Sequence, residues 1–135
     1  MTEKQLCDAA VAAMKNSYSP YSEFCVGAAL LCKNGTVYTG CNIENAAFSP
    51  TVCAERVAIF KAISEGERQF SMIAVAGGTK GTIADGATPC GVCRQVFGEF
   101  CSPDFVVLVV NDEGYSRYTL NELLPFSFGV ENMNV

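Results

Sequence analysis

The sequence predicts an α/β fold, a three-layer α/β/α sandwich with a mixed five-stranded sheet. The predicted elements follow the order α-β-β-α-β-α-β-β-α, which is typical of a mixed sheet with helices on both faces. Two predicted strands, 72–78 and 105–111, are continuous apolar runs, which indicates burial on both sides. The length of 135 residues, half of them hydrophobic, suits one core, so we expect residues 1–135 to form a single domain.

The first part of the chain is predicted to form a helix followed by a β-hairpin. Residues 3–16 are predicted to be helical because their small and apolar side chains share one face. The residues of this face are Leu6, Ala9, Ala10, Ala13 and Met14. After the turn-rich segment SYSPYSEF, the apolar run 24–32 is predicted to pair with a strand over 36–42. Asn34-Gly35 between them is a strong hairpin signal, because this pair tolerates positive φ.

The remaining elements alternate between helix and strand. The loop IENAAFSP leads into a predicted helix over 50–65, with Pro50 in its first turn and Gly66 just past its end. A third helix is predicted over 89–101, after a loop rich in Gly and Thr. The turn NDEG at 111–114 makes the following strand, SRYTL, antiparallel to the apolar run before it, and TLNELLP begins a short last helix.

Composition and charge exclude several classes of function. The net charge is −5 and the 9 basic residues form no cluster, whereas a protein that binds nucleic acid usually has a Lys/Arg patch. We therefore expect a neutral small molecule or a protein as partner, and no nucleic acid. No apolar run reaches the roughly 18 residues of a membrane span, so no membrane contact is expected. The N-terminus lacks a secretory signal and the chain has 8 cysteines, which predicts free thiols and a cytoplasmic protein.

The stretch TPCGVCRQ contains a lone Cys-x-x-Cys pair in a chain without histidine. Cys90 and Cys93 lie at the start of a predicted helix, where residues three apart share a face with Cβ atoms ~5–6 Å apart. Two such thiolates fit a tetrahedral zinc ion, and the helix N-terminus favours the thiolate form. A thioredoxin-type redox pair and two inert core thiols are the alternatives.

A third ligand is predicted within TVCAERVAIF. Cys53, like Cys90, follows a proline near the start of a predicted helix, so two helix N-termini could direct three thiolates at one point. Three protein ligands leave a fourth position for water, which is typical of catalytic zinc. Glu55 is then a candidate proton shuttle. Taken singly, Cys53 is more typical of a buried core thiol and Glu55 of a solvated first-turn residue, but their combination with the Cys-x-x-Cys pair favours a metal site.

These motifs resemble a known family. CAE at 53–55 followed by PCGVC at 89–93 is similar to the signature of the zinc-dependent deaminases. Together with PYSEFCVGAAL and GCNIENAAFS, the motifs resemble the small homotetrameric cytidine deaminases, over nearly the whole chain from Tyr18 to Phe128. The resemblance implies a cytidine deaminase-like fold, and active sites at the interfaces of a homotetramer. It also implies hydrolysis of cytidine and 2′-deoxycytidine to uridine, 2′-deoxyuridine and ammonia in pyrimidine salvage.

The resemblance also implies roles for the motif residues. Cys53, Cys90 and Cys93 would bind one Zn²⁺ per subunit. Glu55 would take a proton from the attacking water, protonate N3 of the cytosine ring and deliver a proton to the departing ammonia. Three thiolates give Zn²⁺ a formal charge of about −1 and weaken its Lewis acidity, so a cation should compensate.

Arg56 is similar to the family's thiolate-bonding arginine and is the first candidate for this compensation. Arg94 is the second candidate. A surface arginine is the alternative interpretation for Arg56.

The resemblance further implies a set of substrate-binding residues. Asn42 and Glu44 would hold the ribose hydroxyls, although both could be turn and cap residues. Phe24 would pack on the nucleoside and Phe128 would enter a neighbouring subunit's site, although both could be ordinary core residues. The backbone around Ala54 would contact the base. One departure concerns position 48, where family members often have Tyr and this chain has Phe48, so a hydroxyl is missing.

Three other functions fit parts of the pattern. A non-catalytic zinc module would not need Glu55, although structural zinc usually has four protein ligands. A deaminase for another aminopyrimidine, such as an antibiotic nucleoside, would use the same motifs, although the pair Asn42 and Glu44 favours cytidine. The acidic balance speaks against a polynucleotide deaminase. The other cysteines are interpreted as core thiols: Cys7, Cys25, Cys32, Cys41 and Cys101.

Overall fold

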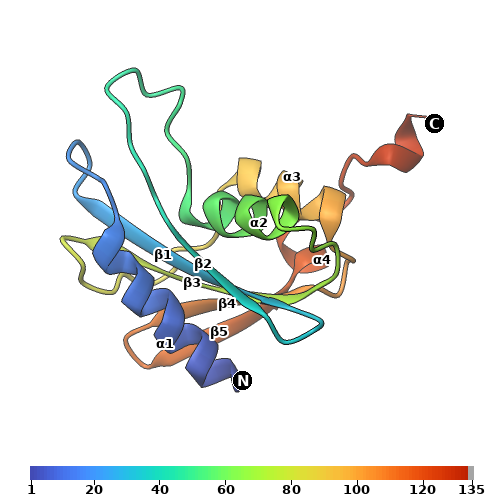
Figure 1. Cartoon of the computed structure of the whole chain (residues 1–135), viewed down its shortest axis with the longest axis horizontal. Coiled ribbons are helices and arrows are strands. Elements are labelled where there is room, and N and C mark those ends of the chain that lie inside the picture. The colour runs from blue at the N-terminus through green and yellow to red at the C-terminus, as the bar shows by residue number, and fades with distance from the viewer. Residues whose placement is uncertain (134–135) are drawn as a thin grey trace.

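The computed structural model describes residues 1–133 and confirms the predicted fold class (Figure 1). Its strands are β1 (Phe24–Cys32), β2 (Val37–Cys41), β3 (Phe70–Thr79), β4 (Val106–Asn111) and β5 (Gly114–Thr119). They form one sheet in the order β2-β1-β3-β4-β5. The β3–β4 pair is parallel and the other neighbouring pairs are antiparallel, so the sheet is mixed.

Helices on both faces of the sheet complete the three layers. They are α1 (Glu3–Ala13), α2 (Ala54–Ser64), α3 (Gly91–Phe100) and α4 (Leu120–Leu123), with single helical turns at Met14–Asn16 and Val130–Asn132. α1 lies on one face, whereas α2, α3 and α4 share the opposite face (Figure 1). Within residues 1–133, no helix has both the length and the apolar character needed to cross a membrane.

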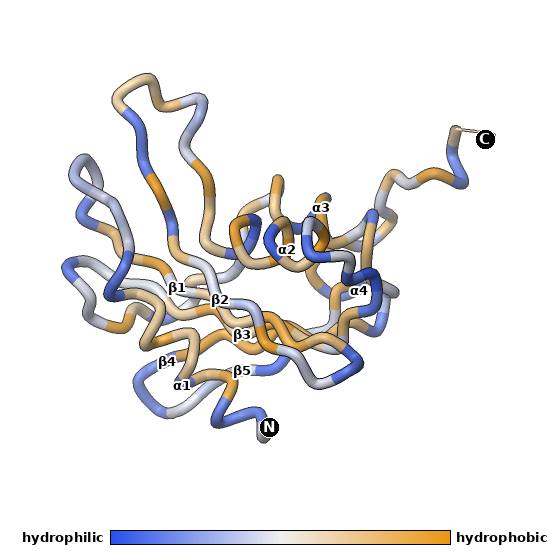
Figure 2. The backbone as a smooth tube through the Cα atoms, viewed as in Figure 1, coloured by the Kyte–Doolittle hydropathy of each residue, from blue (hydrophilic) through white to orange (hydrophobic). Residues whose placement is uncertain are grey.

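Alternate residues of β3 divide the core between the two faces of the sheet. Ala74 and Ala76 pack on the side of α1, while Ile73 and Val75 pack beneath α2 and α3. All four side chains are almost completely buried, which explains why the strand is a continuous apolar run in the sequence. Figure 2 shows this apolar character along β3 and β4.

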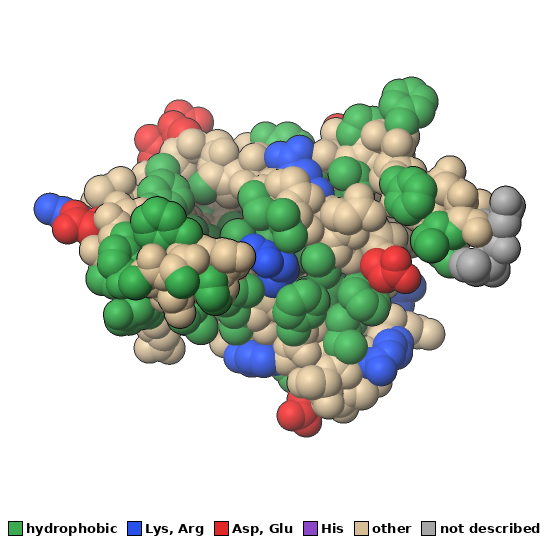
Figure 3. All heavy atoms as spheres, turned by 90° about the horizontal axis from the view of Figure 1, so that it is seen from above, with side chains coloured by type: hydrophobic (Ala, Val, Ile, Leu, Met, Phe, Trp, Pro, Cys, Tyr) green, Lys and Arg blue, Asp and Glu red, His purple; other side chains and the backbone are tan. Residues whose placement is uncertain are grey.

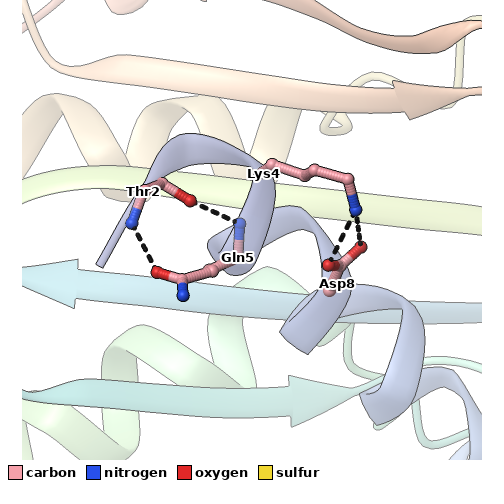
Figure 4. Close-up of polar contacts among 4 residues, drawn as sticks. All are labelled: Thr2, Lys4, Gln5 and Asp8. Carbon is pink, nitrogen blue, oxygen red and sulfur yellow. Dashed lines mark hydrogen bonds and ion pairs between the residues drawn. The ribbon is translucent and has the colours of Figure 1, made fainter.

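The first residues of α1 determine where that helix begins. The Gln5 N–H donates to Thr2 Oγ1 at 3.1 Å, and the Thr2 N–H donates to Gln5 Oε1 at 2.8 Å (Figure 4). This reciprocal capping box satisfies two backbone donors at the N-terminal end. Lys4 and Asp8 form an exposed ion pair on the next turn, which adds little stability.

The helix predicted over 50–65 begins later than expected. α2 starts at Ala54, so the assignment of Pro50 to its first turn is wrong. The physical reason is a long-range pairing. Ile43 and Val52 exchange two backbone hydrogen bonds of 3.0 Å, which hold the segment before the helix in an extended conformation.

Two segments extend beyond the sandwich. One is the loop between β2 and α2, and the other is the segment that follows α4 (Figure 1). Both carry exposed aromatic side chains: Phe48 is 72% exposed, Phe126 104% and Phe128 61%. Exposed apolar groups that cluster on a surface are typical of contact sites.

Candidate active site

Two helix N-termini converge and bring the three motif cysteines together. Cys53 is the N-cap of α2, Cys90 is the N-cap of α3, and Cys93 lies in the first turn of α3. The Cys90 sulfur lies 3.6 Å from the Cys53 sulfur and 3.6 Å from the Cys93 sulfur. Cys90 thus precedes the helix rather than lying in its first turn, because its ψ of 168° is extended.

The three sulfurs fit a tetrahedral zinc ion. Zn–S bonds of about 2.3 Å place ligand sulfurs roughly 3.8 Å apart, which is close to the two observed separations of 3.6 Å. In the described part of the chain, no histidine, aspartate, glutamate or further cysteine joins this cluster. Three protein ligands leave one tetrahedral position for a small molecule, as in catalytic rather than structural zinc sites.

Hydrogen bonds within the cluster favour a thiolate. The pKa of Cys53 is lowered to about 5, chiefly by its interaction with the neighbouring Cys93 thiol. The same interaction, together with burial, raises the pKa of Cys93. Cys53 therefore carries the negative charge readily, and metal binding would release the remaining thiol protons.

A guanidinium group lies against the cysteine cluster. Arg56 follows Cys53 by three residues on α2, and its Nη2 donates to the Cys53 sulfur at 3.4 Å. Its buried Nε has no hydrogen-bond partner among the described residues. Arg94, the second candidate for contact with sulfur, instead donates to Thr88 and to the Pro89 carbonyl. Of the two arginines, Arg56 is thus the one that the structure places on a cysteine sulfur.

Glu55 is a buried carboxyl group beside the cysteines. It is 3% exposed, and this burial raises its pKa to about 7. The negative charge of Cys53 raises the pKa further, while Arg56 opposes the shift. A carboxyl group whose pKa lies near neutrality can both accept and donate a proton, which suits general acid–base chemistry.

A cavity of about 330 Å³ opens beside the cluster. Among its walls are five residues that were singled out in the sequence: Phe24, Asn42, Cys53, Glu55 and Cys90. Sequence reasoning missed the other walls, which are Val26, Thr51, Val52, Val75, Ala87 and Thr88. These are mostly small or apolar residues of strands and loops, so no motif marks them.

Asn42 holds the cavity wall together as well as lining it. Its Oδ1 accepts hydrogen bonds from the Val26 N–H at 2.9 Å and the Ser17 hydroxyl at 2.5 Å. Its Nδ2 donates to the Phe24 carbonyl at 2.8 Å. One amide hydrogen is left over for another acceptor. Asn42 therefore has a structural role through long-range hydrogen bonds, rather than as the turn or cap residue that was the alternative, and one of its donors is left free.

Glu44 lies in a neighbouring hollow of about 400 Å³, which shares Thr51 with the cavity. Its carboxylate accepts hydrogen bonds from the Tyr21 and Ser22 N–H groups at 2.9 and 3.2 Å, and from the Ser22 hydroxyl at 2.5 Å. The Ser22 hydroxyl bond is the main reason why the pKa of Glu44 is lowered. Phe48 lines the same hollow.

Two other predicted residues do not line the cavity. Ala54 is fully buried at the start of α2, with its backbone between Cys53 and Glu55. Phe128 lies in the C-terminal segment, where its carbonyl oxygen accepts a hydrogen bond of 3.0 Å from Gln95 Nε2. Within a single chain, Phe128 is thus not among the residues that line the cavity.

Comparison with known proteins places this fold and cluster among the deaminases. The family model "Cytidine and deoxycytidylate deaminase zinc-binding region" matches residues 1–109. The chain is 48% identical to a cytidine deaminase of Sporosarcina psychrophila, over 90% of this chain and 88% of that protein. It is 47% identical to a cytidine deaminase of Halalkalibacterium halodurans, over 99% of each. A crystal structure of cytidine deaminase from Burkholderia pseudomallei matches with a TM-score of 0.85 at 44% identity, over 95% of this chain and 100% of that one.

The α/β/α sandwich and these matches define a deaminase-type enzyme with a region able to bind metal. The chain belongs to the cytidine deaminase family, because the family model covers most of it and its relatives match over nearly their whole lengths. The resemblance that the cysteine and glutamate motifs indicated is thereby confirmed at the level of the family.

Proposed function

We propose that this protein catalyses the zinc-dependent hydrolytic deamination of cytidine and 2′-deoxycytidine, yielding uridine or 2′-deoxyuridine and ammonia. The observation that carries the proposal is the position of Glu55. This buried carboxyl group lines one cavity together with Cys53 and Cys90, next to the place where a metal would be held. We place the reaction in pyrimidine salvage in the cytoplasm.

Cys53, Cys90 and Cys93 would hold one zinc ion per subunit, as their sulfur separations allow. When bound, zinc supplies Lewis acidity that makes water a nucleophile at neutral pH. The Nη2 group of Arg56, which donates to the Cys53 sulfur, withdraws part of the ligands' negative charge and so preserves that acidity.

Glu55 moves the protons of the reaction. It accepts a proton from the attacking water and delivers it to N3 of the cytosine ring, while the water oxygen bonds to C4. It then accepts the second proton of that oxygen and transfers it to the amino group, which leaves C4 as ammonia. The pKa of Glu55, which burial raises to about 7, suits a group that changes direction between these steps.

The substrate is held by groups around the cavity. The Phe24 ring packs on the nucleoside, and the free amide hydrogen of Asn42 donates to a ribose hydroxyl. Glu44 stays ionised because hydrogen bonds lower its pKa, so it accepts a hydrogen bond from a ribose hydroxyl. The backbone around Ala54 contacts the base.

We further propose that residues 1–135 act as one domain, that the protein assembles as a homotetramer, and that Phe128 enters a neighbouring subunit's site. The support is the exposed apolar surface. Figure 3, viewed from the side of α2 and α3, shows hydrophobic side chains in several places on this face. The exposed apolar residues of α2, α3 and the two protruding segments include Phe48, Phe60, Val92, Phe126 and Phe128.

The proposal is tested by the ultraviolet absorbance of cytidine and 2′-deoxycytidine incubated with wild-type protein and with Glu55→Gln. Zinc is measured in both samples. We expect about one zinc per chain in both, and conversion by the wild type only, because glutamine binds no proton. Zinc without conversion of either nucleoside by the wild type would refute the proposal. A panel that includes cytosine and an aminopyrimidine nucleoside antibiotic would then be tested. Conversion of one of them would identify another substrate, and conversion of none would indicate a structural zinc site.

A further inference from the structure

Arg94 of α3 uses three different nitrogens to contact three separate acceptors. Its Nε donates to the Pro89 carbonyl at 2.7 Å and its Nη2 donates to the Thr88 hydroxyl at 3.1 Å. Its Nη1 donates to the Leu123 carbonyl at 2.8 Å. The acceptors are two backbone carbonyls and a hydroxyl, which are all uncharged. The guanidinium is therefore held by directional hydrogen bonds and not by an ion pair.

The three acceptors belong to two distant parts of the chain. Thr88 lines the cavity, and Pro89 directly precedes Cys90. Leu123 is the last residue of α4, from which the C-terminal segment departs. Arg94 therefore fastens the backbone before a cysteine of the cluster to the end of another helix.

Of the three cysteines, Cys90 depends most on this contact for the position of its sulfur. Cys93 is 0% exposed and packed in the core, and Cys53 receives the hydrogen bond of Arg56. Cys90 is exposed and lies outside the regular helix as its N-cap. The position of its sulfur thus depends on the segment at residues 88–89, where Arg94 donates to the Pro89 carbonyl and to the Thr88 hydroxyl.

We propose that Arg94 is a positioning residue that locks the loop before Cys90 against α4. It thereby keeps the Cys90 sulfur within bonding distance of the metal and Thr88 in the cavity wall. The inference rests on the zinc-dependent activity proposed above. It predicts that the residue acts through the shape of its donor group and not through its charge alone.

Lysine provides the test of shape against charge. A lysine carries the same charge, but its three donors radiate from one nitrogen and cannot reproduce a planar fork that reaches three acceptors. We expect Arg94→Lys and Arg94→Met to behave alike. A residue that acted only by compensating the charge of the thiolates would be replaced well by lysine.

The experiment measures the rate at which zinc-loaded protein releases zinc to a chelating dye, together with kcat and KM for cytidine. Residues that orient metal ligands typically affect metal affinity or activity by about 10–100-fold. We expect both Arg94 variants to release zinc about 10-fold faster or more, and kcat to fall by a similar factor, with a smaller change in KM.

Arg68→Met is the matched control. Arg68 also donates to two backbone carbonyls, those of Ile63 and Glu67, but it does so at the C-terminal end of α2. Its loss removes the same charge and two side-chain hydrogen bonds to backbone carbonyls. We expect zinc release and kcat within about twofold of the wild type.

The inference would be overturned if Arg94→Met released zinc at the wild-type rate. It would also be overturned if Arg94→Lys released zinc at the wild-type rate while Arg94→Met released it faster. If the Arg94 variants do not fold, Thr88→Val removes one acceptor of the fork at nearly constant shape. We expect faster release from it as well, and an unchanged rate would overturn the inference.

Wild-type protein that holds zinc without deaminating cytidine would refute the proposed function alone, because the release rates still test Arg94. Wild-type protein that takes up no zinc would refute both.

Discussion

Gly40 of β2 lies directly against the first turn of α2. A Cβ atom at Gly40 would sit 2.4 Å from the Ala54 carbonyl oxygen and 2.7 Å from the Ala58 nitrogen. Ala54 stands between Cys53 and Glu55 in the chain. The close approach of strand and helix therefore sets the depth at which a cysteine of the cluster and the buried carboxyl group are held.

Gly40→Ala should displace the start of α2, because both close atoms belong to the backbone and neither can move without the helix. We expect the free energy of unfolding to fall by about 1–3 kcal/mol, as for other overpacked cores. We also expect zinc content and kcat to fall, because Cys53 and Glu55 move with the helix. Chemical denaturation, zinc analysis and the absorbance assay measure the three effects.

The matched control for this substitution is Gly27→Ala on the opposite face of the sheet. A Cβ at Gly27 would lie 2.1 Å from the Ala10 carbonyl oxygen of α1, so a comparable loss of stability is expected. α1 carries no residue of the site, and zinc content should be unchanged in the folded protein. Equal loss of zinc in both variants would show that the contact at Gly40 has no particular link to the site.

Arg56→Gln should weaken the metal site, because the Nη2 donor to the Cys53 sulfur is lost. We expect zinc affinity or kcat to fall about 10-fold or more. Arg56→Lys should restore part of the loss, since a single donor at 3.4 Å is involved, in contrast to the three-way contact of Arg94. Unchanged kinetics and zinc content in Arg56→Gln would remove Arg56 from the mechanism.

Asn42→Ala should affect both stability and substrate binding. It leaves the Val26 N–H and the Phe24 carbonyl without their partner, at a cost of about 1–3 kcal/mol if they stay unsatisfied. It also removes the donor proposed for the ribose, so KM for cytidine should rise. Asn111→Ala is the control, since Asn111 bonds Glu113 and Ser116 in the β4–β5 turn, and its KM should match the wild type. A wild-type KM in Asn42→Ala would exclude ribose contact.

Phe128→Ala should raise KM by about 3–10-fold, the expected loss of one aromatic contact, if Phe128 packs in a neighbouring site. Phe126→Ala is the control, because Phe126 is another exposed phenylalanine of the same segment. Sedimentation of both variants shows whether assembly is intact. A monomeric wild type, or identical kinetics in both variants, would remove Phe128 from the substrate site.

Local patterns were sufficient for much of the fold. The strand predicted over 24–32 coincides with β1, because turn residues on either side of an apolar run mark where the strand begins and ends. The face predicted for the first helix contains Leu6, Ala10 and Met14, all of which are buried. The prediction that the motif cysteines stand at helix starts is also confirmed, since Cys53 and Cys90 are N-caps and Cys93 lies in a first turn, where backbone N–H groups favour thiolates.

Contacts between distant residues decided what the sequence left open. The start of α2 depends on the pairing of Ile43 with Val52, which no local signal predicts. The different contacts of Arg56 and Arg94 also could not be predicted, because each arginine follows a motif cysteine in the sequence. Only the packed structure shows that Arg56 donates to the Cys53 sulfur and Arg94 to the Leu123 carbonyl.

The sequence by itself determined the class of fold, the residue types able to bind a metal and the family. These depend on periodicity and on motifs that neighbouring residues carry. Only the tertiary structure decided the distances between the sulfurs, the burial of Glu55 and the apolar walls of the cavity around Val75. The physical reason is that sulfur separation, burial and cavity shape arise from elements that are far apart in the chain and are packed against one sheet.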